Sequence, residues 1–162
     1  MTNRTALVTG ASRGIGRACA LALADAGASV VVAARAVDKL EEVASEIRAQ
    51  GREACVAELD LASPDSIQAA FAKASSEFGR IDILVNNAGV TRDGLALRMK
   101  KADWDTVLNT NLSGAFFSIQ QVLQGMLRAR WGRIINITSV VGEMGNPGQA
   151  NYVASKAGLI GL

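Results

Sequence analysis

Hydrophobic residues in this chain gather in short runs that alternate with longer segments in which they recur every three or four positions. The short runs have the length and composition of buried strands, and the first three are expected at residues 5–9, 29–34 and 53–59. The segments between them have the spacing of helices that bury one face, at residues 15–26, 37–50 and 64–78. Gly27, Gly51 and Gly79 follow these helices, as helix-ending glycines do.

The second half of the chain has two more strand-like runs with a long helical region between them. The strands are expected at residues 81–85 and 133–138, both rich in β-branched residues. The helical region has a broad apolar face made of Val107, Leu108, Leu112, Ala115, Phe116, Ile119, Val122, Leu123, Met126 and Leu127. We expect this face to pack against the sheet and against a second subunit. A last helix is expected from about residue 151 to residue 162.

This alternation predicts an α/β fold with a parallel sheet covered on both faces, because helices supply the right-handed crossovers that parallel strands need. The chain is 49% hydrophobic and 20% charged, which is typical of a globular protein. It contains no repeat, linker or low-complexity tract, so one domain is expected over residues 1–162.

Charge and residue content exclude several classes of function. Seventeen Lys and Arg against fifteen Asp and Glu leave a formal net charge of +2, too small to argue for nucleic acid or anionic lipid as a main partner. No apolar stretch approaches the roughly 18 residues of a membrane span, and we expect a cytoplasmic protein. The absence of histidine excludes histidine-based triads and most zinc sites, and no metal is expected. Cys19 and Cys55 are interpreted as small core residues.

Polar and glycine-rich residues follow the predicted strands, where ligands of parallel sheets bind. Gly10, Gly14 and Gly16 form a loop after the first strand, which allows a tight turn and brings backbone N–H groups to a phosphate at the positive end of a helix. A side chain at Gly14 or Gly16 would hold a cofactor away. The spacing differs from the G-x-G-x-x-G fingerprint, so an ordinary strand-to-helix turn is the alternative.

Arg35 follows the second strand, where an NAD site usually has a carboxylate for the ribose 2′-OH. A cation there favours a 2′-phosphate, and Arg13 in the glycine loop would close the other side of the same phosphate. NADP, in the form of NADPH, is therefore the expected cofactor. The alternative is that Arg35 is a solvated loop charge, and Asp38 is explained as a first-turn helix residue.

The loops after the third and fourth strands offer further contacts to a nucleotide. Asp60 and Leu61 are placed to hydrogen-bond and cover an adenine ring, although Asp60 is almost equally well explained as a helix cap ahead of Ser63. The loop after the fourth strand would hold the strand end while admitting the cofactor closely, through Asn87, Ala88 and Gly89.

Tyr152 and Lys156 are four residues apart in the last predicted helix, so both side chains lie on one face. An ammonium beside a phenol stabilises the phenolate and suits the pair to proton transfer. Ser139 follows the fifth strand and is placed to hydrogen-bond a carbonyl oxygen. Taken alone, the pair reads as a buried tyrosine with an exposed lysine. Asn111, in the long helix, reads as a polar residue satisfied by solvent.

In this order the residues resemble the short-chain dehydrogenase/reductase family, over the entire chain. The resemblance rests on Thr9-Gly-x-x-x-Gly-x-Gly16, Asn86-Asn-Ala-Gly89, Asn111, Ser139 and Tyr152-x-x-x-Lys156. It implies a Rossmann-type doubly wound sheet of strand order 3-2-1-4-5 and a catalytic tetrad of Asn111, Ser139, Tyr152 and Lys156, with Asn111 holding a water that links Lys156 to solvent. It places the cofactor against Gly10, Ser12, Arg13, Gly14, Ile15, Gly16, Arg35, Asp60, Leu61, Asn87, Ala88, Gly89, Tyr152 and Lys156, and the substrate against Ser139, Gln149 and Tyr152.

Within that family the chain looks most like 3-oxoacyl-[acyl-carrier-protein] reductases, through residues 89–93, 97–100 and 140–152. The implied reaction is the NADPH-dependent reduction of a 3-oxoacyl thioester in fatty-acid biosynthesis. Arg130, beside Arg128 and Arg133, matches a position implicated in docking the acidic carrier protein, and the alternative is that these arginines are solvated charges at a helix end. The family resemblance also implies a homodimer or homotetramer.

Family members continue beyond the position of Leu162, with two further strands and a substrate lid, and the chain is therefore expected to be incomplete at its C-terminus. Two other functions stay open. One is a related reductase that acts on an acyl-CoA, a sugar or another alcohol. The other is an inactive fragment that retains nucleotide or subunit binding.

Overall fold

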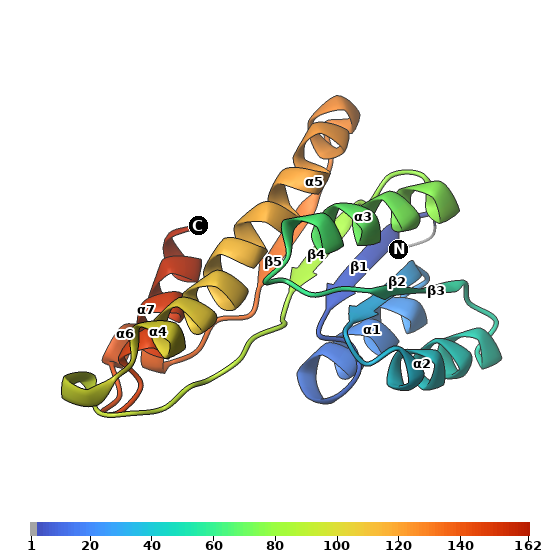
Figure 1. Ribbon diagram of the computed structural model, residues 1–162. Helices are drawn as coiled ribbons and strands as arrows, with labels where there is room; N and C mark the ends of the chain where they lie inside the picture. The colour runs from blue at the N-terminus through green and yellow to red at the C-terminus, as the bar shows by residue number, and fades with distance from the viewer. Residues whose placement is uncertain (1–2) are drawn as a thin grey trace.

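The computed structural model describes residues 3–162 and contains a five-stranded parallel sheet with helices on both faces (Figure 1). The strand order is β3-β2-β1-β4-β5, which confirms the expected α/β fold and its strand order. The strands are β1 (Thr5–Thr9), β2 (Ser29–Ala34), β3 (Ala54–Glu58), β4 (Ile83–Asn86) and β5 (Arg133–Asn136). All four strand pairings are parallel, and β1 lies at the centre between β2 and β4.

The helices that connect the strands are α1 (Gly14–Asp25), α2 (Val37–Ala49), α3 (Pro64–Phe78), α4 (Lys101–Leu108) and α5 (Gly114–Ala129), and two more helices, α6 (Val141–Met144) and α7 (Ala150–Gly161), follow β5. The predicted helices 15–26, 37–50 and 64–78 are confirmed within one residue at each end as α1, α2 and α3. The three glycines expected to end them all have positive φ angles. These conformations suit glycine because it has no Cβ atom.

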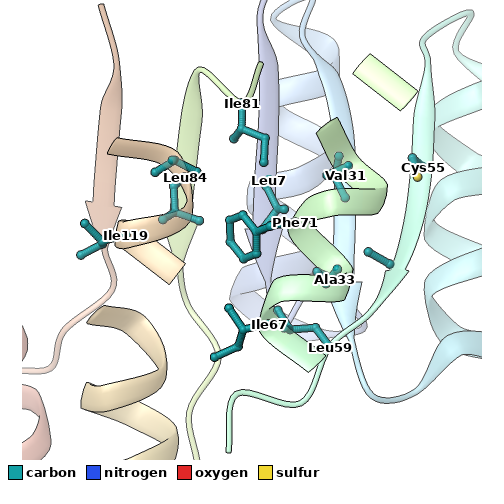
Figure 2. Packing of buried hydrophobic residues seen from close by; sticks show 14 of the residues in the cluster. Leu7, Val31, Ala33, Cys55, Leu59, Ile67, Phe71, Ile81, Leu84 and Ile119 are labelled. Atoms are coloured by element: carbon teal, nitrogen blue, oxygen red, sulfur yellow. The ribbon is translucent and has the colours of Figure 1, made fainter. Parts of the chain in front are cut away.

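Two hydrophobic clusters cover the two faces of the sheet, and the alternation of side chains along β1 assigns residues to them. Leu7 belongs to the cluster with α3 and α5, which contribute Phe71 and Ile119 (Figure 2). Its neighbour Val8 points to the opposite face, where α1 and α2 pack. Both faces of β1 are fully buried, as the continuous apolar strand predicts.

The long helical region is not one helix. A five-residue π-helical segment, Asn109–Ser113, separates α4 from α5, and a 3₁₀ turn, Ala96–Arg98, precedes α4. The periodicity of apolar residues does not reveal this break, because the apolar residues on both sides keep helical spacing; the segment contains the buried polar side chain of Asn111. Helix α6 was not predicted either, and the strands expected at 53–59, 81–85 and 133–138 are shorter or shifted by up to two residues.

The apolar face of this region is only partly covered. Val107, Ala115, Ile119, Val122 and Met126 are buried, which confirms its packing against the sheet and α3. Phe116, Leu123 and Leu127 on α5 are exposed. The expectation of a second subunit against this face stays a prediction.

Two other expectations concern the cysteines and the membrane. Cys55 is buried in β3, Cys19 is half-buried in α1, and both are free thiols. Within residues 3–162 we find no helix with the length and apolar character that crossing a bilayer requires.

Candidate active site

The carboxyl ends of β1 to β4 open onto a cavity of about 580 Å³, at the edge of the sheet where ligands of α/β proteins bind. Eleven of the residues expected to hold a cofactor line this cavity. They are Gly10, Ser12, Arg13, Gly14, Ile15, Arg35, Asp60, Leu61, Asn87, Ala88 and Gly89. Gly16, Tyr152 and Lys156 do not line it. The cavity therefore brings together the loops that follow four strands.

The glycine loop wraps tightly from β1 into the first turn of α1. Gly10 and Gly14 have φ angles of +67° and +56°, in the left-handed region that favours glycine. A Cβ atom at Gly14 would meet nothing within 4 Å, so this backbone is open to the cavity. The loop presents the N-terminal end of a helix to the cavity, which is a favourable place for a phosphate group.

Position 16 requires glycine for a different reason from the one predicted. A Cβ atom there would lie 2.3 Å from the carbonyl oxygen of Gly10 and 2.4 Å from the side-chain nitrogen of Asn87. Gly16 lets the first turn of α1 pack onto the glycine loop and the end of β4. Its absent side chain serves the packing of the chain itself, and only the open position at Gly14 fits the explanation that a side chain would hold a cofactor away.

Thr9 and Asn87 join the ends of β1 and β4. The Thr9 hydroxyl donates to the Val85 carbonyl at 3.3 Å and accepts from the backbone N–H groups of Asn87 and Ala88. The Asn87 side chain donates to the Thr9 carbonyl at 2.9 Å and to the Gly10 carbonyl at 3.3 Å. Asn87 therefore holds the strand end, as expected, while the role of Thr9 as a shared hydrogen-bond partner was not predicted.

Three cations line the part of the cavity next to β2. Arg13 and Arg35 were predicted, and Lys39 in the first turn of α2 is an addition that was not predicted. Within the described part of the chain, none of the three forms an ion pair. Such unpaired cations around one cavity suit a ligand that carries phosphate groups.

Asp60 is not the cap of the following helix. Its carboxylate accepts a hydrogen bond from the backbone N–H of Ala62 at 3.0 Å, and the hydroxyl of Ser63 caps α3 by accepting from Ser66. The capping interpretation of Asp60 is therefore wrong. The side chain bends its own loop at the cavity wall, next to the largely buried Leu61.

Tyr152 and Lys156 lie one turn apart on α7, and the Lys156 ammonium is 5.7 Å from the centre of the Tyr152 ring. Lys156 is 4% exposed and donates a 2.7 Å hydrogen bond to the Ile137 carbonyl, just after β5. Burial lowers the pKa of Lys156 below that of an ordinary lysine. The interpretation of Lys156 as an exposed lysine is therefore wrong.

Ser139 follows β5 and is half-buried, and its carbonyl accepts a 2.9 Å hydrogen bond from the N–H of Gly142. Gly142 belongs to α6, which packs against α7 so closely that a Cβ atom there would lie 3.0 Å from the backbone of Lys156. Among residues 3–162 the Ser139 hydroxyl has no hydrogen-bond partner, so it is available to a ligand.

Asn111 is 1% exposed, so the interpretation as a residue satisfied by solvent is wrong. Its side-chain oxygen accepts from the Val90 N–H at 2.8 Å, and its side-chain nitrogen donates to the Val90 carbonyl at 2.9 Å and to the Ser155 hydroxyl at 3.1 Å. Asn111 thus joins the π-helical segment to the loop after β4 and to α7. Its expected role in holding a water stays a prediction.

The two remaining predicted residues lie outside the cavity lining. The Gln149 side chain donates to the Asp93 carboxylate at 3.2 Å and accepts from Asn146, so it already links two loops. Arg130 is exposed at the end of α5 with a φ of +51°, near the amino end of β5 and thus at the opposite edge of the sheet from the cavity. The cavity lining also includes Arg92, which lies within the motif at residues 89–93, and Thr106 and Thr110, which no motif indicates.

The residues of α7 are suited to proton transfer, and a hydrogen bond from Asn151 connects this helix to Arg92 in the cavity wall. A phenol, a buried ammonium and an unpartnered serine hydroxyl come from α7 and from the segment after β5, and the cavity offers a helix N-terminus and three cations. A serine hydroxyl can hold a carbonyl oxygen while a phenol gives that oxygen a proton.

Comparisons with known proteins agree with this geometry. A model of the short chain dehydrogenase family matches residues 4–162. The chain is 55% identical over 161 residues to the 3-oxoacyl-[acyl-carrier-protein] reductase FabG of Staphylococcus epidermidis, covering 99% of this chain and 66% of that protein. It is 52% identical over 163 residues to the 3-oxoacyl-[acyl-carrier-protein] reductase of Synechocystis, again covering 66% of the relative.

A solved structure, a metagenomic short-chain oxidoreductase in complex with NADP, superposes on this chain with a TM-score of 0.94 and is 43% identical in sequence. The alignment covers 99% of this chain and 73% of the solved one. The chain spans about two thirds of the length of the curated relatives that it matches.

Proposed function

The chain belongs to the short chain dehydrogenase family, and on that premise we propose that it carries the cofactor site and catalytic residues of an NADPH-dependent 3-oxoacyl-[acyl-carrier-protein] reductase of fatty-acid biosynthesis. The observation that carries the proposal is the placement of Tyr152 and the buried Lys156 on one face of α7, a helix that hydrogen bonds connect to Arg92 in the lining of the cavity. The names of the relatives that are about half identical to this chain support the choice of substrate class.

The donors and the charge of the cavity lining suit NADPH. Gly14 leaves backbone open at the N-terminus of α1 for a pyrophosphate, and Asp60 and Leu61 line the wall expected to hold the adenine. Arg13, Arg35 and Lys39 would hold the 2′-phosphate, which NADH lacks. A bound nicotinamide in its reduced form supplies a hydride, and the solved relative in complex with NADP supports this cofactor.

The chain's own residues supply the proton and the orientation. Ser139 would hold the 3-oxo oxygen of the thioester, and the Tyr152 hydroxyl would give this oxygen its proton as the carbon–oxygen double bond becomes a single bond. The Lys156 ammonium, held by the Ile137 carbonyl, places a positive charge beside the phenolate that results. Asn111 would retain its predicted place in the tetrad as the link between α7 and the loop after β4.

An acyl-carrier-protein thioester is the proposed substrate, and Arg130 is its proposed docking residue together with Arg128 and Arg133. All three arginines are exposed around the end of α5. Exposed cations suit an acidic protein partner, and they steer its approach more than they hold it. We further propose a homo-oligomer, for which the exposed Phe116, Leu123 and Leu127 are the supporting observation. The two free thiols support a cytoplasmic location.

The test measures NADPH oxidation with acetoacetyl thioesters of acyl-carrier protein and of coenzyme A, beside a simple ketone. We expect turnover with preference for the carrier-protein thioester. The Tyr152→Phe variant should lose roughly 10²- to 10⁴-fold in kcat while its Kd for NADPH is unchanged, because only the proton donor is removed. Preference for the ketone would instead favour a related reductase, and NADPH binding without any turnover would favour a nucleotide-binding role.

A further inference from the structure

Helix α7 carries a second pair of residues with the same spacing as Tyr152 and Lys156. Asn151 and Ser155 each precede one member of that pair, so they lie on the neighbouring face of the helix, one turn apart. Both are 0% exposed. Buried polar side chains persist when their hydrogen bonds are made, so their partners indicate what they hold.

Asn151 joins the start of α7 to two other elements. Its side-chain nitrogen donates to the Arg92 carbonyl at 2.9 Å and to the Asp103 carbonyl in α4 at 3.3 Å. Its side-chain oxygen accepts from the N–H of Tyr152 at 2.7 Å. The backbone of Tyr152 is thereby connected, through one buried amide, to the loop after β4.

Ser155 makes the corresponding connection one turn later. Its hydroxyl donates to the Tyr152 carbonyl at 2.8 Å and accepts from the Asn111 side chain at 3.1 Å. Asn111 in turn makes two hydrogen bonds to the backbone of Val90. The N–H and the carbonyl of Tyr152 are therefore both held by buried side chains that lead back to residues 90–92.

Val90 and Arg92 line the cavity, so this loop is part of the wall against which a cofactor would lie. Two attachment points one turn apart fix both the rotation of a helix about its axis and its position along that axis. We propose that Asn151 and Ser155 are positioning residues, which set the orientation of the Tyr152 hydroxyl relative to the cavity wall. The catalytic meaning of this orientation rests on the function proposed above.

The experiment compares Ser155→Ala and Asn151→Ala with Ser118→Ala in the protein as it is purified. Ser118 is a matched control because it is also a 0% exposed helical serine, and its hydroxyl donates to the Gly114 carbonyl at 2.8 Å. It has no hydrogen bond to α7 or to residues 90–92 within the described chain. If the loss of a buried helical hydroxyl is all that matters, kcat should fall equally in Ser155→Ala and Ser118→Ala.

Tyr152 gives a signal that does not require activity, because it is the single tyrosine in the sequence. In protein labelled with ¹³C-tyrosine, the ring carbon that bears the hydroxyl yields one resonance. We expect this resonance to move in Ser155→Ala and Asn151→Ala and to stay in place in Ser118→Ala. We also expect kcat to fall roughly tenfold in the first two variants, with the Kd for NADPH within about threefold of the unsubstituted protein. Ser155→Thr, which keeps the hydroxyl, should recover most of kcat.

The results separate this proposal from the proposed function. If the unsubstituted protein reduces no thioester but the resonance still moves in the two α7 variants alone, the positioning role holds and the proposed function fails. If thioester reduction is present and neither kcat nor the resonance distinguishes Ser155→Ala from Ser118→Ala, the positioning role is overturned. Should Asn151→Ala not fold, Ser155→Ala decides the question by itself.

Discussion

A Cβ atom on Gly16 would lie 2.3 Å from the carbonyl oxygen of Gly10, so the first turn of α1 touches the start of the loop that precedes it. The contact involves backbone on one side, which cannot rotate away as a side chain can. Any side chain at position 16 must therefore displace either the loop or the helix. Because Gly10 lines the cavity, such a displacement reaches the ligand site.

Gly16→Ala should lower the free energy of unfolding by about 1–3 kcal/mol and weaken NADPH binding, because it forces a packed backbone apart. Gly125→Ala is the matched control in α5, where the added Cβ would meet only the flexible Arg80 side chain, at 3.2 Å. That control should be neutral or gain roughly 0.5–1 kcal/mol from the better helix propensity of alanine. Urea unfolding and NADPH titration measure both effects, and equal losses in the two variants would contradict the explanation.

Arg35→Ala should raise the Kd for NADPH roughly 10- to 100-fold, because a charged hydrogen bond to the 2′-phosphate is lost. The Kd for NADH should change little, since NADH has a neutral 2′-hydroxyl in place of that phosphate. Arg52→Ala removes an exposed arginine beyond the end of α2 and outside the cavity, and it should affect neither cofactor. Fluorescence titration with both cofactors checks this, and an equal loss for NADH would show that Arg35 does not recognise the phosphate.

Asp82 should make the protein sensitive to acid. Burial acts to raise its pKa, but hydrogen bonds from Arg80, from the Thr5 N–H and from Arg4 outweigh burial, so the pKa lies below its ordinary value. Because the pKa of Asp82 is lower in the folded than in the unfolded state, its ionised carboxylate stabilises the folded state. This stabilisation is complete at pH values above the unfolded-state pKa of about 3.9. This stabilisation is lost as the pH falls through the folded pKa.

The Asp82→Asn variant should therefore be less stable than the unsubstituted protein at pH 7, by about 1–3 kcal/mol, with a smaller difference near pH 3. Urea unfolding at both pH values measures the difference. Asp65→Asn is the control, because Asp65 is exposed in the first turn of α3 and has no arginine partner among residues 3–162. A difference for Asp82→Asn that does not change with pH would count against the role of the carboxylate charge.

Arg130→Gly should increase stability while weakening carrier-protein docking. Arg130 has a left-handed backbone with a φ of +51°, which costs an L-residue about 1–2 kcal/mol. Glycine avoids this cost, but it loses roughly 0.5–1 kcal/mol because its unfolded chain has more conformational entropy. We expect a gain of up to about 1.5 kcal/mol and a higher KM for the carrier-protein thioester alone, with the coenzyme A thioester unaffected. Arg128→Ala removes a neighbouring cation within α5 and should bring no such gain in stability.

The fold could be predicted largely from hydrophobic periodicity, because strands buried on both faces read as continuous apolar runs. The bounds of β1, β2 and α3 were predicted to the residue. The break between α4 and α5 could not be, since Leu108, Leu112 and Ala115 keep helical spacing through the π-helical segment. The segment holds the buried Asn111 amide, which pairs with Val90, and a contact between residues that are distant in sequence leaves no local pattern.

Residue type alone indicates chemistry at Tyr152, Lys156 and Arg35, and the roles of these three residues stay predictions. Residue type gives no such indication for a polar residue whose hydrogen bonds hold another part of the chain. Thr9 and Ser155 belong to common residue types, and only their contacts in three dimensions distinguish them from surface hydroxyls. The predicted explanation of Gly16, that a side chain would displace a cofactor, failed for the same reason: the atom nearest to an added Cβ is the backbone oxygen of Gly10.

The central place of β1 has a consequence for how the protein is made on the ribosome. The N–H of Thr5 finds its partner in Asp82, 77 positions later in the chain. At translation rates of about 5–20 residues per second, β1 leaves the ribosome roughly 4 to 15 seconds before β4 is available to pair with it. For that interval the nascent chain has an open apolar strand edge, which is the state that chaperones bind.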